Sequence, residues 1–345
     1  MDVMRLHFLS KRFALISSGC SLLTVVFCLL FLFYFHYGVL GFFLASFLAS
    51  VLMFPISIWS IKKDLVVLID IKWCIKLLQY GYPMIFSGIF YWALSTVDRW
   101  MLAMYKDVYE IGLYSIGFKF ANIIIFINNA VVQAWIPFCM KMFSEDENYK
   151  RKIADIYSCY ICVLVFLGTM ISLFSKEILM FLVPTEYLNA ASTLSVLVIG
   201  TVVYSSTQFS VIGITFEQKT KYVSYVSFIA LIVNILLNFL FIPIYGSVGA
   251  SVAMLLSYLI MTILYFFITS RIHYIPYSKY INCYCLFVLV FSSICGNMII
   301  QEGCSMFSTI VKIIVMWSLF FPVLVIYRKK FRILLINFIG GRRTV

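Results

Sequence analysis

Charged side chains are scarce in this chain. Asp, Glu, Lys and Arg make up only 12% of its 345 residues, whereas 63% are apolar and the mean hydropathy is +1.03. A soluble protein must cover its surface with polar groups, so this composition excludes a soluble fold of this length. Lipid accepts such a surface, and the composition therefore predicts an all-α polytopic membrane protein.

Residues that usually build chemical centres are few or dispersed. The three histidines, His7, His36 and His273, lie far apart and give no metal-binding pattern. No G-x-x-x-x-G-K-[ST] motif is present, so we expect no ATP consumption by this chain. The CxxC of Cys159 and Cys162 lies in an apolar run, where thiols usually behave as small hydrophobes. The sequence therefore predicts neither a metal nor a cofactor.

Acidic residues are the scarcer sign of charge. There are 14 of them against 26 Lys and Arg, which gives a net charge of +12. The basic residues fall in short gaps between apolar runs and form no continuous patch. Such a distribution argues against nucleic acid as a partner and is typical of the charges that orient membrane helices.

Ten apolar runs are long enough to cross a bilayer, which takes about 20 residues. They are 14–34, 39–60, 83–104, 113–139, 155–175, 188–213, 222–243, 247–269, 280–300 and 307–327. With the N-terminus in the cytoplasm, most Lys and Arg fall in cytoplasmic segments, and only Lys106 and Lys176 fall in outer loops. This asymmetry predicts that both termini are cytoplasmic.

A short turn sequence occurs twice. The segment LLFLFYFHYGVLG (29–41) aligns without a gap on LNFLFIPIYGSVG (237–249), including the Tyr-Gly-x-x-Gly of each turn. Each turn follows a helix that leaves the cytoplasm and begins one that returns. We interpret this as a parallel repeat of the kind seen in transporters with two similar halves.

The second copy of the repeat carries a family resemblance. Its motifs are GYPMIFSGIFYWALSTVDRWML (81–102), IGLYSIGFK (111–119), Pro137 and NILLNFLFIPIYGSVGAS (234–251). In this order they resemble the polysaccharide flippases, which translocate O-antigen or capsule repeat units. These belong to the multidrug/oligosaccharidyl-lipid/polysaccharide exporter superfamily, together with the multidrug extrusion (MATE) proteins and the lipid II flippase.

The resemblance implies a partial two-lobed MATE-like fold with about ten transmembrane helices. On this basis residues 1–60 are the last two helices of the N-terminal lobe, and 61–82 are a cytoplasmic linker between lobes. Residues 83–269 are a six-helix C-terminal lobe, and 270–345 are two extra helices with a basic tail. The first four helices of the family pattern have no counterpart here. A truncated transporter, natural asymmetry and a chance repeat are the explanations that the sequence leaves open.

The resemblance also implies a substrate, an undecaprenyl-pyrophosphate-linked oligosaccharide of the bacterial inner membrane. Membrane lipids and other polysaccharide assembly proteins are the further partners we expect. Charges inside spans normally face a cavity or a partner, and four occur here: Asp98, Arg99, Lys119 and Lys312. Arg99 and Lys119 are the candidate phosphate ligands. Lys312 lies near the outer end of its helix, where we expect it to snorkel to the interface.

Asp98 is the candidate coupling group, carrying a proton, and also a candidate substrate contact. The structural alternative is that it forms an ion pair with Arg99 or Lys119. Asn129 and Gln133 are candidate sugar contacts, although such residues more often hydrogen-bond a neighbouring helix. Asn128, Asn234 and Asn238 are expected to be structural in the same way.

Other functions share parts of this pattern. A multidrug or cation antiporter has the same fold. A membrane polysaccharide polymerase or acyltransferase is also polytopic, but needs an acid–base cluster that the short outer loops lack. We therefore expect a transporter and no enzymatic activity.

Overall fold

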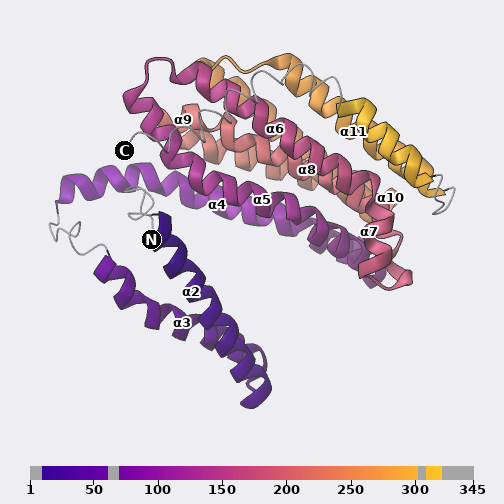
Figure 1. Cartoon of the computed structure of the whole chain (residues 1–345), viewed down its shortest axis with the longest axis horizontal. Coiled ribbons are helices and arrows are strands. Elements are labelled where there is room, and N and C mark those ends of the chain that lie inside the picture. Colours follow the sequence, from indigo (N-terminus) through magenta and orange to yellow (C-terminus); the bar gives the residue numbers. More distant parts are fainter. Residues whose placement is uncertain (1–9, 61–69, 302–307, 321–345) are drawn as a thin grey trace. The chain divides into compact units, whose positions relative to one another are not determined.

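The structure, a computed structural model, describes residues 10–60, 70–301 and 308–320. Most of these residues are helical: α2 (Ser10–Leu29), η1 (Leu30–Tyr34), α3 (Gly38–Ser60), α4 (Ile71–Tyr105), α5 (Val108–Glu145), α6 (Tyr149–Leu173), α7 (Ser175–Leu182), η2 (Thr185–Tyr187), α8 (Ala190–Ser210), α9 (Ile212–Phe216), α10 (Lys221–Ile272), α11 (Lys279–Gln301) and a last helix, Ser308–Phe320. Figure 1 shows their order along the chain. The predicted all-α fold is confirmed, because hydrocarbon leaves backbone groups no partner outside their own helix.

Seven helices among the described residues are long and apolar enough to cross a membrane. One of them, α10, contains two predicted spans, 222–243 and 247–269. Helix α4 contains the predicted span 83–104 but is not among the seven, since polar and charged residues interrupt its apolar run. The last predicted span begins in Ser308–Phe320, and its end lies outside the described residues.

The predicted start of the span 83–104 is wrong. Its first residue, Pro83, lies inside α4, which already begins at Ile71. The second part of the predicted linker 61–82 is therefore helical and continuous with the following span, whereas 61–69 lie outside the described residues. Membrane helices tolerate an internal proline when neighbouring groups satisfy the freed backbone. Pro83 lacks the N–H that would bond the carbonyl oxygen of Gln79. Next to that group, the Thr220 hydroxyl donates to the Tyr80 carbonyl oxygen at 2.8 Å.

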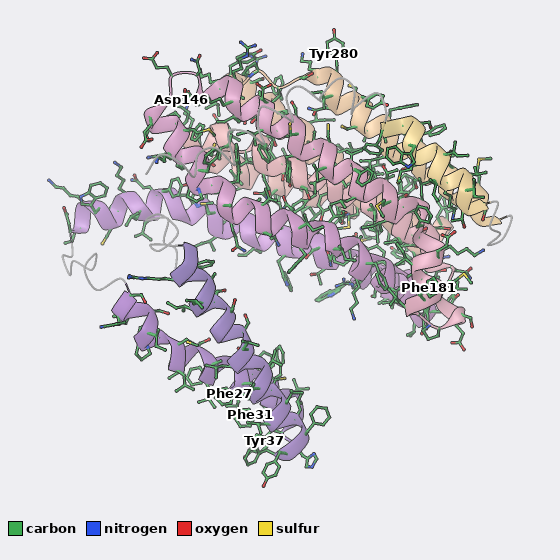
Figure 2. The ribbon with its side chains drawn as sticks, viewed as in Figure 1. Phe27, Phe31, Tyr37, Asp146, Phe181 and Tyr280 are labelled. Atoms are coloured by element: carbon green, nitrogen blue, oxygen red, sulfur yellow. The ribbon has the colours of Figure 1, made fainter. Side chains whose placement is uncertain are left out.

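The chain divides into two compact units. The first consists of residues 1–74 with 133–141, and the second of 75–132 with 142–345. Helices α2 and α3 of the first unit pack against each other. The turn between them is held by stacked aromatic rings, with ring centroids 6.3 Å apart for Phe27 and Phe31 and 6.0 Å apart for Phe31 and Tyr37. Figure 2 labels these three side chains at the turn.

Helix α8 is the centre of the second unit, because 83% of its most apolar window is buried. It packs against α6, α10 and α11. Small residues allow this: a Cβ at Gly200 would lie 3.5 Å from the Leu255 Cα, and a Cβ at Gly168 would lie 2.9 Å from the Val202 side chain. Close approach through small residues is how membrane helices associate when lipid supplies no hydrophobic driving force.

The repeated turn of the sequence is a repeated backbone conformation. Gly38 has a φ of 54° and Gly246 a φ of 57°, a region that other L-residues rarely adopt. The second glycine of each turn lets the chain approach the preceding helix: a Cβ at Gly41 would lie 3.0 Å from the Phe31 Cβ, and one at Gly249 would lie 2.4 Å from the Phe241 carbonyl oxygen. The two copies therefore agree in geometry as well as in sequence.

The break in α10 at Gly246 is held by other helices. Gly246, with ψ at −131°, turns the backbone so that the next N–H leaves the helical pattern. That N–H, of Ser247, donates to Oε2 of Glu110 at the start of α5, 2.7 Å away. The Ser247 hydroxyl also accepts from the Thr193 hydroxyl of α8 at 3.3 Å. The turn thus fastens the hairpin of α10 to two neighbours.

Gly246→Ala is expected to destabilise the protein by about 1–3 kcal/mol from backbone strain alone. The new Cβ would also lie 2.6 Å from the Glu110 carboxylate and displace it from Ser247. The measurement is thermal unfolding in detergent. Gly88→Ala is the matched control, because a Cβ there meets nothing within 4 Å. Equal melting temperatures for the two variants would contradict the expected role of Gly246.

The prediction that Lys312 snorkels to the interface is wrong. Its side chain is buried in the second unit, and Nζ donates to Oε1 of Glu177 in α7 at 2.6 Å. Its ammonium also lies 5.8 Å from the ring centroid of Phe174. A buried cation needs a partner, and the sequence could not show that α7 brings Glu177 to this place.

Candidate functional site

A buried polar network connects α4, α5 and α10 in the second unit. Its centre is Asp98, which is fully buried. Its Oδ2 accepts from the Tyr114 hydroxyl at 2.5 Å, and its Oδ1 accepts from the Asn238 amide at 2.6 Å. The same amide nitrogen lies 3.0 Å from Oδ1 of Asn234, one helical turn earlier. Charge-assisted hydrogen bonds of this kind are the strong ones, so the network fixes the three helices together.

The predicted ion pair of Asp98 with Arg99 or Lys119 does not form. Within the described residues, no Lys or Arg nitrogen lies within 4.0 Å of the Asp98 carboxylate. Two hydrogen bonds from neutral side chains take the place of the cation. The reason is geometric: neighbouring residues on a helix point about 100° apart, so Asp98 and Arg99 face different surroundings.

The network is incompletely satisfied. Two buried polar atoms, Nδ2 of Asn234 and Oδ1 of Asn238, have no hydrogen-bond partner. Buried polar groups normally have one, so these two atoms beside a carboxylate are exceptions. Among the described residues no three His, Cys, Asp or Glu side chains come together as they would to hold a metal ion.

Arg99 lies on a different side of α4 and is half-buried. Its guanidinium carbon lies 4.9 Å from the ring centroid of Phe118 on α5, a cation–π contact. Its Nε is buried without a hydrogen-bond partner. The planar fork of the guanidinium is thus held in place by an aromatic ring, while part of its hydrogen-bonding capacity remains unused.

Helix α5 carries a polar stripe that one exposed apolar side chain, Phe126, interrupts. We define this stripe by five residues that lie within about 80° of one another on an α-helix: Ser115, Lys119, Asn122, Asn129 and Gln133. The side chains of Lys119, Asn129 and Gln133 are exposed, and those of Ser115 and Asn122 are half-buried. Hydrocarbon is a poor environment for such a row of polar groups, so the stripe requires a polar surface opposite.

Arg99 borders this stripe. Phe118, under its guanidinium, precedes Asn122 by four residues, and residues at this spacing are neighbours on a helix surface. The arrangement brings two cations and several neutral hydrogen-bonding groups to one region of the second unit, whereas Gln133 belongs to the first. Phosphate oxygens suit the cations, and hydroxyl groups suit the amides.

The predicted site residues therefore separate into two sets. Arg99, Lys119, Asn129 and Gln133 lie at or beside the stripe, whereas Asp98 lies in the buried network. Asn128 lies on another face of α5, where it is buried and accepts from the Tyr160 hydroxyl, as the structural interpretation predicted. Sequence reasoning missed Ser115 and Asn122, although their 3.6-residue periodicity with Lys119 was a usable signal. It also missed Tyr114, whose partner is distant in sequence.

Two family models match the chain. The model described as MatE matches residues 83–240, and the model described as polysaccharide biosynthesis protein matches residues 9–143. No curated protein matches this sequence. The two models adjoin and overlap at the α4–α5 region, which contains Asp98, Arg99 and Lys119.

Two solved structures have a similar fold. A mutant of the Vibrio cholerae MATE transporter VcmN has a TM-score of 0.61 at 14% identity, covering 78% of this chain and 64% of its own length. The lipid II flippase MurJ in an inward closed conformation has a TM-score of 0.60 at 16% identity, covering 92% of this chain and 67% of its own length. This chain thus spans about two thirds of either transporter. The predicted resemblance to the exporter superfamily and its MATE-like fold is confirmed.

Proposed function

We propose that this membrane chain, which has the fold of the exporter superfamily, translocates a lipid-linked oligosaccharide. The substrate we propose is an undecaprenyl-pyrophosphate-linked O-antigen or capsule repeat unit, moved from the cytoplasmic to the periplasmic leaflet by alternating access. The match to the polysaccharide biosynthesis family and the fold shared with a lipid II flippase support this class of substrate.

The observation that carries the proposal is the polar stripe on α5. An oligosaccharide pyrophosphate headgroup has many hydroxyls and a negative charge, and neither enters hydrocarbon without a polar path. Hydroxyl, amide and ammonium groups on one face of α5, between Ser115 and Gln133, supply one half of such a path. A purely structural role would place these groups against neighbouring helices, as happens to Asn128 on another face of α5.

The site residues have distinct proposed roles. Arg99 and Lys119 bind the pyrophosphate, the first as a planar fork and the second as a compact charge. Asn129 and Gln133 hydrogen-bond the sugars, together with Ser115 and Asn122. Asp98 is the coupling group: its burial and its incompletely satisfied neighbours favour a change of protonation during the cycle, which separates it from the substrate contacts.

The domain organisation and orientation remain proposals. Residues 1–60 form the last helices of one lobe, 83–269 form the second lobe, and 270–345 add two helices and a basic tail. The distribution of Lys and Arg supports cytoplasmic termini and a bacterial inner-membrane location. Other polysaccharide assembly proteins are the proposed protein partners, and we propose no enzymatic step and no cofactor.

A multidrug or cation antiporter is the second candidate, because the MatE model matches most of the predicted second lobe. The stripe distinguishes the two functions. Multidrug sites bind organic cations and would be hindered by Arg99 and Lys119, whereas an anionic pyrophosphate is attracted by both. A polymerase or acyltransferase has less support, since neither site region has an acid–base cluster.

The test is restoration of surface polysaccharide in a bacterium that lacks its own flippase and is supplied with a matching repeat unit. Lys119→Met is expected to lower the restored polysaccharide by at least about tenfold, because it removes a charge-assisted contact from the path. Lys150→Met is the matched control, since that exposed side chain lies at the start of α6, outside the stripe.

The same cells distinguish the competing functions. Resistance to cationic drugs without restored polysaccharide would favour the antiporter. Equal polysaccharide from Lys119→Met and Lys150→Met would remove the stripe from the proposed path. The amount of each protein in the membrane must be equal for these comparisons.

A further inference from the structure

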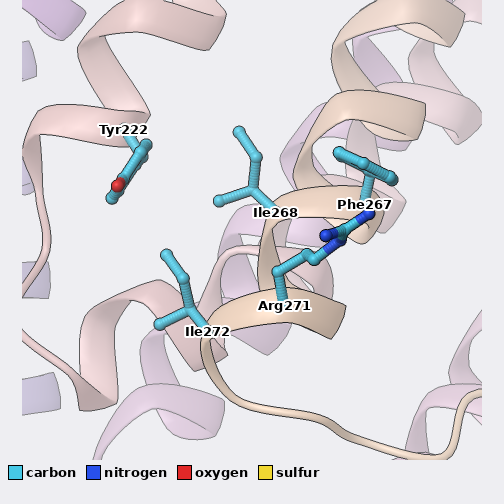
Figure 3. Close-up of a pocket in the computed structure, with 5 residues that line it drawn as sticks. All are labelled: Tyr222, Phe267, Ile268, Arg271 and Ile272. Atoms are coloured by element: carbon cyan, nitrogen blue, oxygen red, sulfur yellow. The ribbon is translucent and has the colours of Figure 1, made fainter.

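An open groove lies where the two ends of α10 meet. It has a volume of about 320 Å³ and is lined by Tyr222 from the beginning of the helix and by Phe267, Ile268, Arg271 and Ile272 from its end. Figure 3 shows these side chains around the groove, with the Arg271 guanidinium beside the Phe267 ring. The groove is distinct from the polar stripe and from the Asp98 network.

The two ends meet because α10 is folded at Gly246 into a hairpin. Pairs of residues near the open end show the antiparallel arrangement: the Tyr265 hydroxyl donates to the Val223 carbonyl oxygen at 3.2 Å and lies 3.4 Å from the Ser227 hydroxyl. The same hydroxyl lies 2.7 Å from that of Tyr91 on α4. The walls of the groove are therefore held by hydrogen bonds just inside it.

The groove lies at a membrane boundary. Towards the fold of the hairpin, exposed apolar side chains such as Tyr225, Phe228 and Ile263 form a surface suited to lipid. At the open end the apolar run stops, and basic residues, Lys219, Lys221 and Arg271, follow at once. Lipid phosphates lie at this transition from hydrocarbon to water.

The charge at the groove is positive and uncompensated. The Arg271 guanidinium carbon lies 5.0 Å from the Phe267 ring centroid, and the Lys221 ammonium lies 5.4 Å from that of Tyr222. In the described part of the chain, neither cation has a carboxylate within 4.0 Å. The nearby acid Glu217 instead contacts Nδ1 of His273 at 3.0 Å.

We propose that this groove binds the phosphate of an anionic membrane phospholipid. The Arg271 fork contacts the phosphate oxygens, Lys221 adds a second positive charge, and the acyl chain lies along Phe267 and Ile268. Arginine is suited to this role because its planar donors match phosphate, while its stem packs on apolar surface. The lipid would fasten the open end of the hairpin in the way that Glu110 fastens its folded end. A free phosphate ion shares the headgroup chemistry but would gain nothing from the apolar wall.

The test measures lipid retained by the full chain, purified in detergent, by native mass spectrometry. The probes are phosphatidylglycerol, phosphatidylcholine with the same acyl chains, and inorganic phosphate. We expect phosphatidylglycerol to bind at least about tenfold more tightly than phosphatidylcholine, and Arg271→Gln to remove this preference. Lys279→Gln is the matched control, an exposed cation at the start of α11 that does not line the groove. It should bind phosphatidylglycerol like the unchanged protein.

A second variant keeps the test valid if Arg271→Gln is poorly stable. Ile268→Trp fills the groove without removing a charge. It should weaken the binding of phosphatidylglycerol as Arg271→Gln does. Equal binding by Arg271→Gln and Lys279→Gln would overturn the proposal in favour of general charge attraction. Displacement of the lipid by millimolar inorganic phosphate would also overturn it, in favour of a soluble ligand. None of these outcomes depends on the proposed transport, which is not measured.

Discussion

The Arg99→Ala substitution is expected to lower translocation of the lipid-linked oligosaccharide by at least about tenfold while leaving the protein folded. Arg99 has no carboxylate partner among the described residues, and its main contact is the face of Phe118. Its removal therefore leaves no buried charge unpaired, which is the usual cause of large destabilisation. The substitution removes the guanidinium that we propose binds the pyrophosphate, so transport is expected to fall.

Arg99→Lys separates the effect of the positive charge from that of the guanidinium geometry. Lysine keeps the charge but loses the bidentate geometry, so we expect intermediate transport if the guanidinium binds phosphate. The measurement is transfer of a fluorescent lipid-linked oligosaccharide across proteoliposomes, with thermal unfolding of each variant measured beside it. Arg151→Ala is the matched control, because Arg151 is exposed at the start of α6. Unchanged transport by Arg99→Ala would contradict the proposed binding of pyrophosphate and would leave Arg99 only the structural contact with Phe118.

The second large effect is expected at Asp98. Asp98→Leu would leave the Tyr114 hydroxyl and the Asn238 amide buried without an acceptor, at about 1–3 kcal/mol for each group. We expect this variant to be strongly destabilised. Asp98→Asn keeps an acceptor for Tyr114, and the Asn238 amide can turn its unused Oδ1 towards the new amide. This variant should fold and isolate the effect of the charge.

For Asp98→Asn we expect transport to fall by at least about tenfold and to become independent of an imposed proton gradient, because an amide cannot bind and release the coupling proton. The measurement is transport into proteoliposomes over a series of pH differences. Tyr160→Phe is the control, since it removes a buried hydrogen bond to Asn128 outside the network. A gradient response that survives in Asp98→Asn would assign the network a structural role.

The partners of Asp98 and Lys312 could not be predicted from the sequence. A charge inside a span normally faces a cavity or a partner, and both side chains are buried against partners. This rule does not identify those partners. Asp98 is bound by Tyr114 and Asn238 in place of a cation, and Lys312 pairs with Glu177 in place of reaching the interface. Partners of this kind come from other helices, so their identity depends on how the helices pack.

The polar stripe is an intermediate case. Lys119, Asn129 and Gln133 were recognised one by one as polar residues in a span. Their common helix face follows from the 3.6-residue period and could have been predicted from the sequence, together with Ser115 and Asn122. The sequence could not show whether that face is buried or exposed. Burial depends on which other helices pack against it, and the periodicity of one helix does not reveal them.

The sequence by itself determined the membrane environment, the helical spans and the repeated glycine turn. These depend on local properties: apolar length, and the backbone angles that only glycine adopts easily at Gly38 and Gly246. The tertiary structure alone decided that α4 runs through Pro83, that Glu110 holds the break in α10, and that both ends of α10 form one groove. The physical reason is that these features arise from contacts between distant segments, whose free energy depends on packing in three dimensions.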